Sequence, residues 1–265
     1  MIGISSTHYI LHSNYYLLTM TFHTTGIVLR IEHRGENDRV AHVYTDTHGK
    51  LELFVKSGRR MASKLSPHLE ELTIAECYVV RGHLDHLAGI ERVVRHDLLH
   101  TSLFHMGNAA WAVELVMLLT RPDHPDRRIF DALTAWFAFL EKMPSTILPE
   151  RLRLAFLMPI LDFLGYRPEF EKCVLCAASQ SAQWFFSGND GGLVCGACKQ
   201  KARGGLIVCD ARAVGALQTM GDQPVAFDHD AYRELNDPLA RSLTDALLMN
   251  HLSRPLESLR FLAYV

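Results

Sequence analysis

The sequence contains no long apolar run, no excess of basic charge and no short catalytic motif. No stretch reaches the roughly eighteen uninterrupted apolar residues of a membrane span. Lysine and arginine number 27 against 29 for aspartate and glutamate, so binding to nucleic acid would need a local basic patch. GxGxxG, GxSxG and HExxH motifs are absent, and Gly191 and Gly196 have P-loop spacing but are followed by Ala197 instead of lysine. These absences disfavour, without excluding, an enzyme.

The first residues lack the features of an export signal. Residues 1–19 contain no lysine or arginine, and histidine and asparagine interrupt their apolar run. Met20 immediately precedes the first well-patterned strand. We therefore expect Met20 to be the functional start, residues 1–19 to be an N-terminal extension, and the protein to act in the cytoplasm without membrane contact.

Hydrophobic residues alternate with a period of two from residue 24 to residue 97. In the first segment Ile27, Leu29 and Ile31 share one face, and polar residues take the other. Further segments of this kind lie at 51–55, 72–80 and 87–94, with turn-like stretches between them. This spacing predicts a small, closed, five-stranded β-barrel over residues 20–98. An SH3-like barrel would give much the same pattern.

After Leu98 the period becomes helical. The amphipathic stripe of 129–140 and the nearly all-apolar stretch 109–119 predict two helices, the second at the centre of a bundle. A third helix is predicted over 148–164, bent or broken near Pro159. Helical patterning returns at 211–220 and 237–252. The chain is therefore expected to be an α+β multidomain protein whose helical domain has two parts, 99–165 and 206–265, separated by a module at 166–205.

Four of the six cysteines form two matched pairs in that module. Cys173 and Cys176 make one CxxC turn, and Cys195 and Cys198 make the other. A CxxC turn places two sulfurs on the same side of a tight loop, and two facing turns complete a tetrahedron. The pattern predicts one structural Zn²⁺ ion per chain, bound by all four thiolates.

Other roles for these cysteines fit less well. Disulfides are disfavoured in a chain without an export signal, and a redox CxxC would need a single pair in a βαβ setting. Four thiolates would leave no open position for catalysis at the metal. Cys77 is expected to be a small buried hydrophobe, and Cys209 a spare thiol.

A basic loop follows the third predicted strand. The stretch VKSGRRMASK (55–64) contains no acidic residue and has four positive charges, at Lys56, Arg59, Arg60 and Lys64. Such a cluster on a barrel rim can bind phosphates, and a solvated charged loop is the alternative. Arg30 and Arg39 could extend the patch, and Phe54 and Tyr44 are candidates for stacking on bases.

The order of these parts resembles the RecO family of bacterial recombination mediator proteins. The segments that carry the resemblance are TGIVLRIEHRGENDRV (25–40), YTDTHGKLELFVKSGRR (44–60), LGYRPEFEKCVLC (164–176) and RPLESLRFL (254–262). The second contains the counterpart of the family's Lys-Gly-x-Arg loop, with Ser57 as one extra residue. Together they span the chain from about residue 22 to residue 262.

The resemblance implies that the barrel is an OB-fold that binds single- and double-stranded DNA and anneals complementary strands. It further implies partnership with RecR and with the C-terminal tail of the single-stranded DNA-binding protein (SSB) in loading RecA, in the cytoplasm at the nucleoid. DNA contacts are then expected from Arg30, Lys56, Arg59, Arg60 and Lys64.

The helical domain is the expected docking site for that acidic, hydrophobic-ended tail. Residues 102–165 contain more large aromatic side chains than one stripe per helix requires. Most of these must be core, but a groove between helices could remain. Candidates for a basic rim are Arg121, Arg127, Arg128, Arg151 and Arg153.

Two other classes of function remain open from the residues alone. One is a zinc-containing nucleic-acid enzyme without a linear motif, which turnover assays with DNA and Mg²⁺ would reveal. The other is a protein-interaction adaptor whose basic loop contacts an acidic partner, which would lack the salt dependence of DNA binding.

Overall fold

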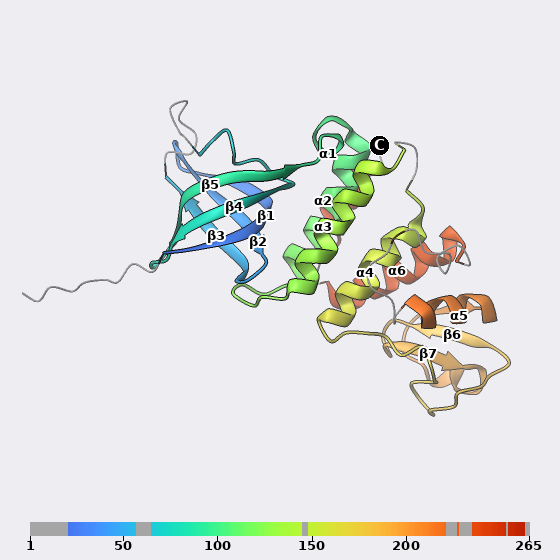
Figure 1. Cartoon of the computed structure of the whole chain (residues 1–265). Coiled ribbons are helices and arrows are strands. Elements are labelled where there is room, and N and C mark those ends of the chain that lie inside the picture. The colour runs from blue at the N-terminus through green and yellow to red at the C-terminus, as the bar shows by residue number, and fades with distance from the viewer. Residues whose placement is uncertain are drawn as a thin grey trace, which may run out of the picture.

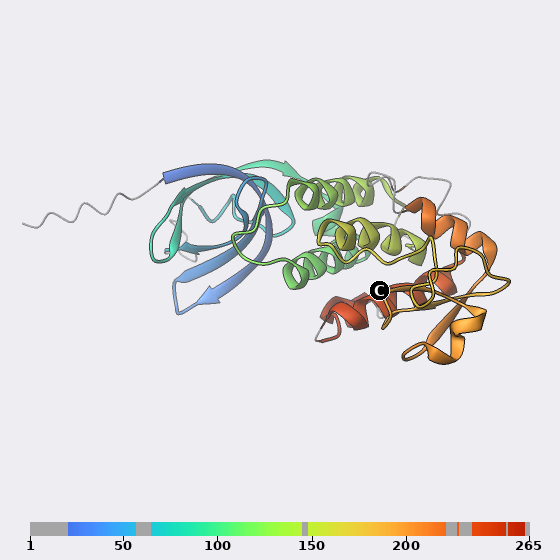
Figure 2. The same cartoon turned by 90° about the horizontal axis from the view of Figure 1, so that it is seen from below.

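The computed structural model describes residues 21–56, 65–144, 148–220, 227, 235–252 and 254–262. A β-barrel lies at one end, a small three-stranded sheet lies toward the other, and helices fill the space between them (Figures 1 and 2). The predicted extension 1–19 and the basic-loop residues Arg59, Arg60 and Lys64 lie outside the described ranges.

The barrel forms from β1 (Thr21–Arg34), β2 (Asp38–Thr45), β3 (Gly49–Val55), β4 (Thr73–Val80) and β5 (Asp85–Arg95). Its closed order is β1-β2-β3-β5-β4, with β3 and β5 parallel and the other pairs antiparallel. Consecutive hairpins followed by a crossover that closes the sheet give the Greek-key arrangement of an OB-fold. The structure thus confirms the predicted barrel.

A β-bulge in β1 changes which residues face the barrel interior. The register shifts between Val28 and Arg30, where one extra residue is accommodated. Ile27 and Leu29 pack outward into the core shared with the helices, whereas Val28 and Ile31 pack inside the barrel. The expectation that Ile27, Leu29 and Ile31 share one face is therefore wrong, because the bulge breaks the period of two.

The first part of the helical domain contains α1 (Leu98–Thr101), α2 (Leu103–Leu119), α3 (Arg127–Lys142) and α4 (Glu150–Phe163). Helix α3 buries the predicted stripe of Ile129, Leu133 and Leu140, and Asp126 caps it by accepting from the backbone N–H of Arg128. The helix α4 runs unbroken through Pro159. The predicted aromatic residues form the centre of this core, with the Trp111 and Trp136 rings 6.1 Å apart.

The remaining elements begin with β6 (Trp184–Ser187), β7 (Gly192–Cys195), the short 3-10 helix η1 (Gly196–Lys201) and β8 (Leu206–Cys209). Strand β8 pairs with β6, so the sheet continues past residue 205, where the sequence places the end of the module. Helices α5 (Ala211–Met220), α6 (Asp237–His251) and α7 (Glu257–Leu262) complete the chain. Helix α6 packs on α4, and α7 packs on α2.

The turn between β2 and β3 joins the barrel to the helices. Gly49 has a φ of +70°, and a Cβ there would lie 2.5 Å from the carbonyl oxygen of His124 in the α2–α3 loop. Next to it, the Lys50 ammonium donates to the carbonyl oxygens of Met117 and Thr120 at 2.6 and 2.7 Å. The turn thus docks closely on the end of α2.

Candidate metal centre and nucleic-acid interface

The four predicted cysteine ligands come together in one cluster. Cys173 and Cys176 belong to the turn that precedes β6, Cys195 ends β7, and Cys198 lies in η1. Their sulfur atoms all lie within 4.8 Å of one another. Four sulfurs around zinc at about 2.3 Å would be separated by about 3.8 Å, and the sulfurs of Cys176 and Cys195 lie 3.6 Å apart, so the cluster is close to the size that the ion requires.

Two thiols of the cluster have opposite pKa shifts. Burial opposes ionisation of Cys173, but backbone N–H donors, that of Cys195 first, lower the pKa of its thiol to about 6. The sulfur of Cys176, followed by burial, raises the pKa of the Cys198 thiol to about 12. Four sulfurs this close cannot all be thiolates unless a positive ion offsets their charge, so the donor set suits a thiophilic divalent metal.

The backbone around the cluster fixes the two CxxC turns against each other. The backbone N–H of Val174 donates to the Leu193 carbonyl oxygen at 2.9 Å. Gly192 packs so closely that a Cβ there would lie 2.4 Å from the carbonyl oxygen of Glu169. Arg203, which follows η1, pairs with Asp190 at 2.8 Å. The cluster is therefore rigidly supported by its own small sheet.

Cys77 and Cys209 lie outside this cluster. Both are buried and free, and burial raises the pKa of Cys77 to about 12 and that of Cys209 to about 11. Each therefore remains a neutral thiol, and Cys77 is the small buried hydrophobic residue that the sequence predicts.

Of the predicted DNA-binding residues, the structure describes Arg30 and Lys56. Lys56 is exposed at the end of β3, where the basic loop begins. Arg30 is exposed on the outer side of β1, beside the helices, and lies 3.3 Å from the Glu32 carboxylate. These two residues therefore do not form one compact patch.

The two aromatic stacking candidates differ in exposure. Phe54 is partly exposed on the outer side of β3, and its ring lies edge-on to that of His86 at 5.2 Å. Tyr44 is fully buried, and its hydroxyl donates to the Asp126 carbonyl oxygen at 3.3 Å. The expectation that Tyr44 stacks on bases is wrong, because the helices cover that face of β2.

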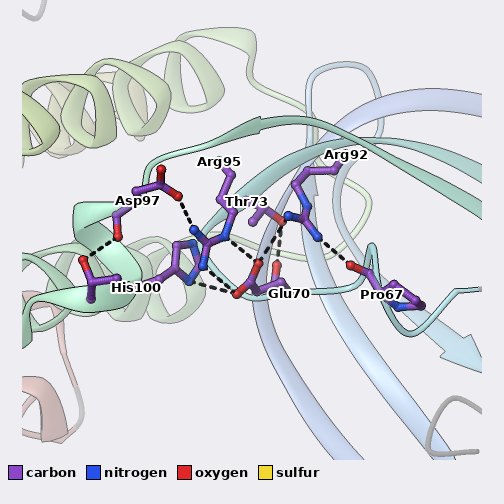
Figure 3. A network of polar contacts seen from close by, with 8 residues as sticks. Pro67, Glu70, Thr73, Arg92, Arg95, Asp97 and His100 are labelled. Carbon is purple, nitrogen blue, oxygen red and sulfur yellow. Dashed lines mark hydrogen bonds and ion pairs between the residues drawn. The ribbon is translucent and has the colours of Figure 1, made fainter. Parts of the chain in front are cut away.

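A polar network occupies the end of the barrel near α1 (Figure 3). The Glu70 carboxylate accepts from Arg95 at 2.9 and 3.2 Å, and the His100 ring nitrogen lies 3.4 Å away. The bond from Arg95 is the main cause that lowers the pKa of Glu70. Arg95 also pairs with Asp97. No local motif predicts this network, because Glu70 lies 25 residues before Arg95 and meets it only in the folded barrel.

Most of the arginines expected to form a basic rim on the helical domain are paired with acidic residues. Arg127 pairs with Asp131 and Asp46, and Arg128 pairs with Asp126. Arg151 lies 3.3 Å from Asp237. Arg153 is buried and donates to Glu150 and Asn108, so it is part of the core. Arg121 is exposed.

Two family models match the chain, one in each part of the fold. The model described as Recombination protein O N terminal matches residues 20–94, and Recombination protein O C terminal matches residues 100–260. The chain belongs to the RecO family. The first match covers the OB-like barrel and the second covers the helical domain with its cysteine cluster, which confirms the resemblance seen in the sequence.

Individual RecO proteins are similar to this chain over most of their length. The DNA repair protein RecO of Anaeromyxobacter dehalogenans (strain 2CP-C) is 31% identical over 249 residues, which cover 90% of this chain and 94% of that protein. The DNA repair protein RecO of Myxococcus xanthus (strain DK1622) is 30% identical over 244 residues, covering 91% and 96%. RecO membership thus places the chain among DNA repair proteins. None of its described helices is both long and apolar enough to cross a bilayer.

Proposed function

We propose that this chain is a recombination mediator that binds single- and double-stranded DNA, anneals complementary strands and, with RecR, helps load RecA onto SSB-coated DNA. It would do so in the cytoplasm, at the nucleoid. The observation that carries the proposal is the match of both RecO family models, which together span residues 20–94 and 100–260. The OB-like barrel supports it, since folds of this kind commonly bind single strands.

DNA would meet the barrel through its cations. Lys56 stands exposed where β3 leads into the basic loop, and Arg59, Arg60 and Lys64 follow it in the sequence. Contacts of lysine and arginine with phosphates are independent of sequence, so binding should show no base preference. Phe54 on the outer side of β3 could add stacking on a base.

Zinc is the proposed occupant of the cysteine cluster, with a structural role. Thiolate ligands and near-tetrahedral spacing suit zinc, and metal binding to such sites stabilises the local fold. Since Cys173, Cys176, Cys195 and Cys198 would fill all four positions, no substrate could reach the metal. We therefore propose that the chain is a mediator and not an enzyme.

The acidic C-terminal tail of SSB is the proposed ligand of the helical domain. The aromatic side chains that indicated a groove within 102–165 are mostly buried as core. An apolar groove of about 400 Å³ instead lies between α6 and α7, lined by Leu248, Met249, Leu252 and Leu259. Met249 is 83% exposed there, and Arg254 stands at the edge. A hydrophobic tail end would fit this groove, with Arg254 near its carboxylates.

Strand annealing tests the proposal directly. Complementary oligonucleotides coated with SSB would be mixed with the purified chain, with and without RecR, and duplex formation followed by fluorescence. We expect annealing by the chain alone, and RecA loading only when RecR is added. Met249→Glu should weaken binding of an SSB tail peptide, while Met106→Glu, which lines the neighbouring β1–α2–α7 groove and not the first, serves as its control. Absence of DNA binding and annealing would contradict the proposal.

A further inference from the structure

The inward-facing rows of two barrel strands end in arginine. On β2, Val43 and Ala41 belong to the apolar interior, and Arg39 is the next residue of that row. On β5, Ile90 belongs to the interior and Arg92 follows it, opposite the buried Ala75. Side chains two residues apart on a strand share a face, so both arginines point into the same end of the barrel.

Arg95 joins them from β5. It pairs in register with the buried Thr73, two residues before Ala75, so it lies on the same face. The three arginines, with Glu70 and Asp97, line an open polar depression of about 710 Å³, bordered also by Ser66 and Pro67. Counting the two carboxylates against the three guanidinium groups leaves the depression with a positive charge.

The three arginines of this depression differ in their contacts with the Glu70 carboxylate. Glu70 forms an ion pair with Arg95 (Figure 3). Arg92 lies 3.8 Å from the same carboxylate and donates to the Pro67 carbonyl oxygen at 2.5 Å. Among the described residues, the Arg39 side chain has no acceptor for its buried Nε–H and no ion pair with a carboxylate. Glu70 therefore pairs with Arg92 and Arg95, and no described carboxylate pairs with Arg39.

Two nitrogen donors at this site also lack acceptors. The Nε atoms of Arg39 and Arg92 are buried and have no hydrogen-bond partner in the described part of the chain. Buried donors without a partner are uncommon and costly, since each loses its bonds to water. An anion in the depression would supply an acceptor for both.

We propose that this depression binds a backbone phosphate of a nucleic-acid strand, with Arg39 and Arg92 donating through their Nε–H groups. The inference rests on the proposed function and gives it a specific phosphate site. Arg39 pairs in register with Val55, so the site adjoins Lys56 at the start of the basic loop. A strand that contacts Lys56 would therefore lie close to this depression.

The chemistry of the donors favours phosphate. Guanidinium groups match the oxygens of phosphate in a planar fork, and several of them together neutralise its charge. An open depression admits a phosphate that stays attached to a strand on both sides. Free phosphate presents the same oxygens, so the test must separate the two sources.

The first measurement is the salt dependence of binding to a fluorescent oligothymidine. The variants are Arg39→Gln, Arg92→Gln and the double variant of the full chain, and the control is Arg212→Gln, an exposed arginine on α5. Loss of one phosphate contact should reduce the steepness of the log–log salt slope by about 0.7. The control should keep the wild-type slope. Arg39→Lys retains the charge without the Nε–H, so it should bind more weakly than wild type with nearly the wild-type slope.

The second measurement observes the two donors directly. The ¹⁵N–¹H signals of the arginine Nε–H groups are assigned with Arg39→Lys and Arg92→Lys. They are then recorded with oligothymidine and, separately, with inorganic phosphate. We expect the Arg39 and Arg92 signals to shift at oligonucleotide concentrations far below the phosphate concentration needed. Shifts with inorganic phosphate but none with oligothymidine would overturn the assignment to a strand.

The outcomes separate this inference from the proposed function. If wild type binds DNA and the double variant keeps its affinity and slope, the phosphate site is wrong while the proposed function stands. If wild type does not bind DNA, both fail. Arg39→Gln removes no described side-chain hydrogen bond or ion pair, so it should remain folded, with a thermal unfolding midpoint close to that of wild type.

Discussion

The Lys50 ammonium on β3 lies 2.7 Å from the main-chain oxygen of Thr120, the residue that ends α2. It also donates to the Met117 oxygen at 2.6 Å. The last carbonyl groups of a helix lack partners within it and carry partial negative charge. A barrel lysine thus satisfies the end of a helix in the other domain, which fixes how the two parts meet.

Replacing Lys50 should therefore weaken the chain as a whole. Lys50→Met keeps the aliphatic stem and removes the donor, so it should lower the free energy of unfolding by about 1.5–3 kcal/mol. Lys56→Met, at the exposed end of the same strand, should change it by less than about 0.5 kcal/mol. Urea unfolding would measure both. Equal, small effects would mean that Lys50 does not hold the domains together.

Gly49 gives a second test of the same contact. Gly49→Ala must adopt a positive φ and also push its Cβ against the backbone of His124, 2.5 Å away. Gly35 has a φ of +64° but nothing within 4 Å of its Cβ position, so Gly35→Ala should cost only about 1–2 kcal/mol. The Gly49 variant should cost roughly 2 kcal/mol more in thermal or urea unfolding. Equal costs would show that the turn can move away from α2.

Much of this architecture is predictable from local patterns. Alternation predicts the barrel strands, the helical stripe predicts α3, and the spacing of Cys173, Cys176, Cys195 and Cys198 predicts their cluster. These succeed because each depends on neighbours in the sequence.

What escaped prediction depends on strand register and domain contact. The bulge at Val28 and Arg30 changes faces without a sequence signal, and Tyr44 is buried only because the helices cover it. The sequence around Lys50 predicts only a turn, because its contacts with the end of α2 depend on how the two domains pack. Arg39 and Arg92 share the mouth of the barrel only once the sheet closes.

Metal content tests the cysteine cluster. Purified chain should contain one zinc per molecule, and Cys195→Ser should lose metal and unfold at lower temperature, because ligand loss uncouples the two CxxC turns. DNA binding by the barrel should change far less. Cys77→Ala, a buried thiol outside the cluster, is the control and should keep its zinc. Wild-type protein without metal, with all four thiols reacting freely, would contradict the zinc assignment.

Acid should weaken the Glu70 network. The bond from Arg95 lowers the pKa of Glu70 below its ordinary 4.5, so the carboxylate stabilises the fold above that pH. This contribution is lost as the pH falls through the lowered pKa. After solvent screening it should amount to about 0.5–1 kcal/mol. Glu70→Gln should thus destabilise the fold at pH 7, and its stability should approach that of wild type as the pH falls through the lowered pKa of Glu70. Glu91→Gln, an exposed carboxylate on β5, is the control. If the difference in the free energy of unfolding between Glu70→Gln and wild type does not change with pH, ionisation of Glu70 is not its cause.

We propose that the barrel binds DNA through phosphate contacts at the end of β3 and in the loop that follows. The most direct measurement is the affinity of the full chain for a single-stranded oligonucleotide across a series of salt concentrations. With roughly four phosphates neutralised, the account predicts a log–log slope near −3. Lys56→Glu combined with Arg59→Glu and Arg60→Glu should weaken binding to every sequence alike and flatten the slope. Unchanged affinity and slope in that variant would contradict the account.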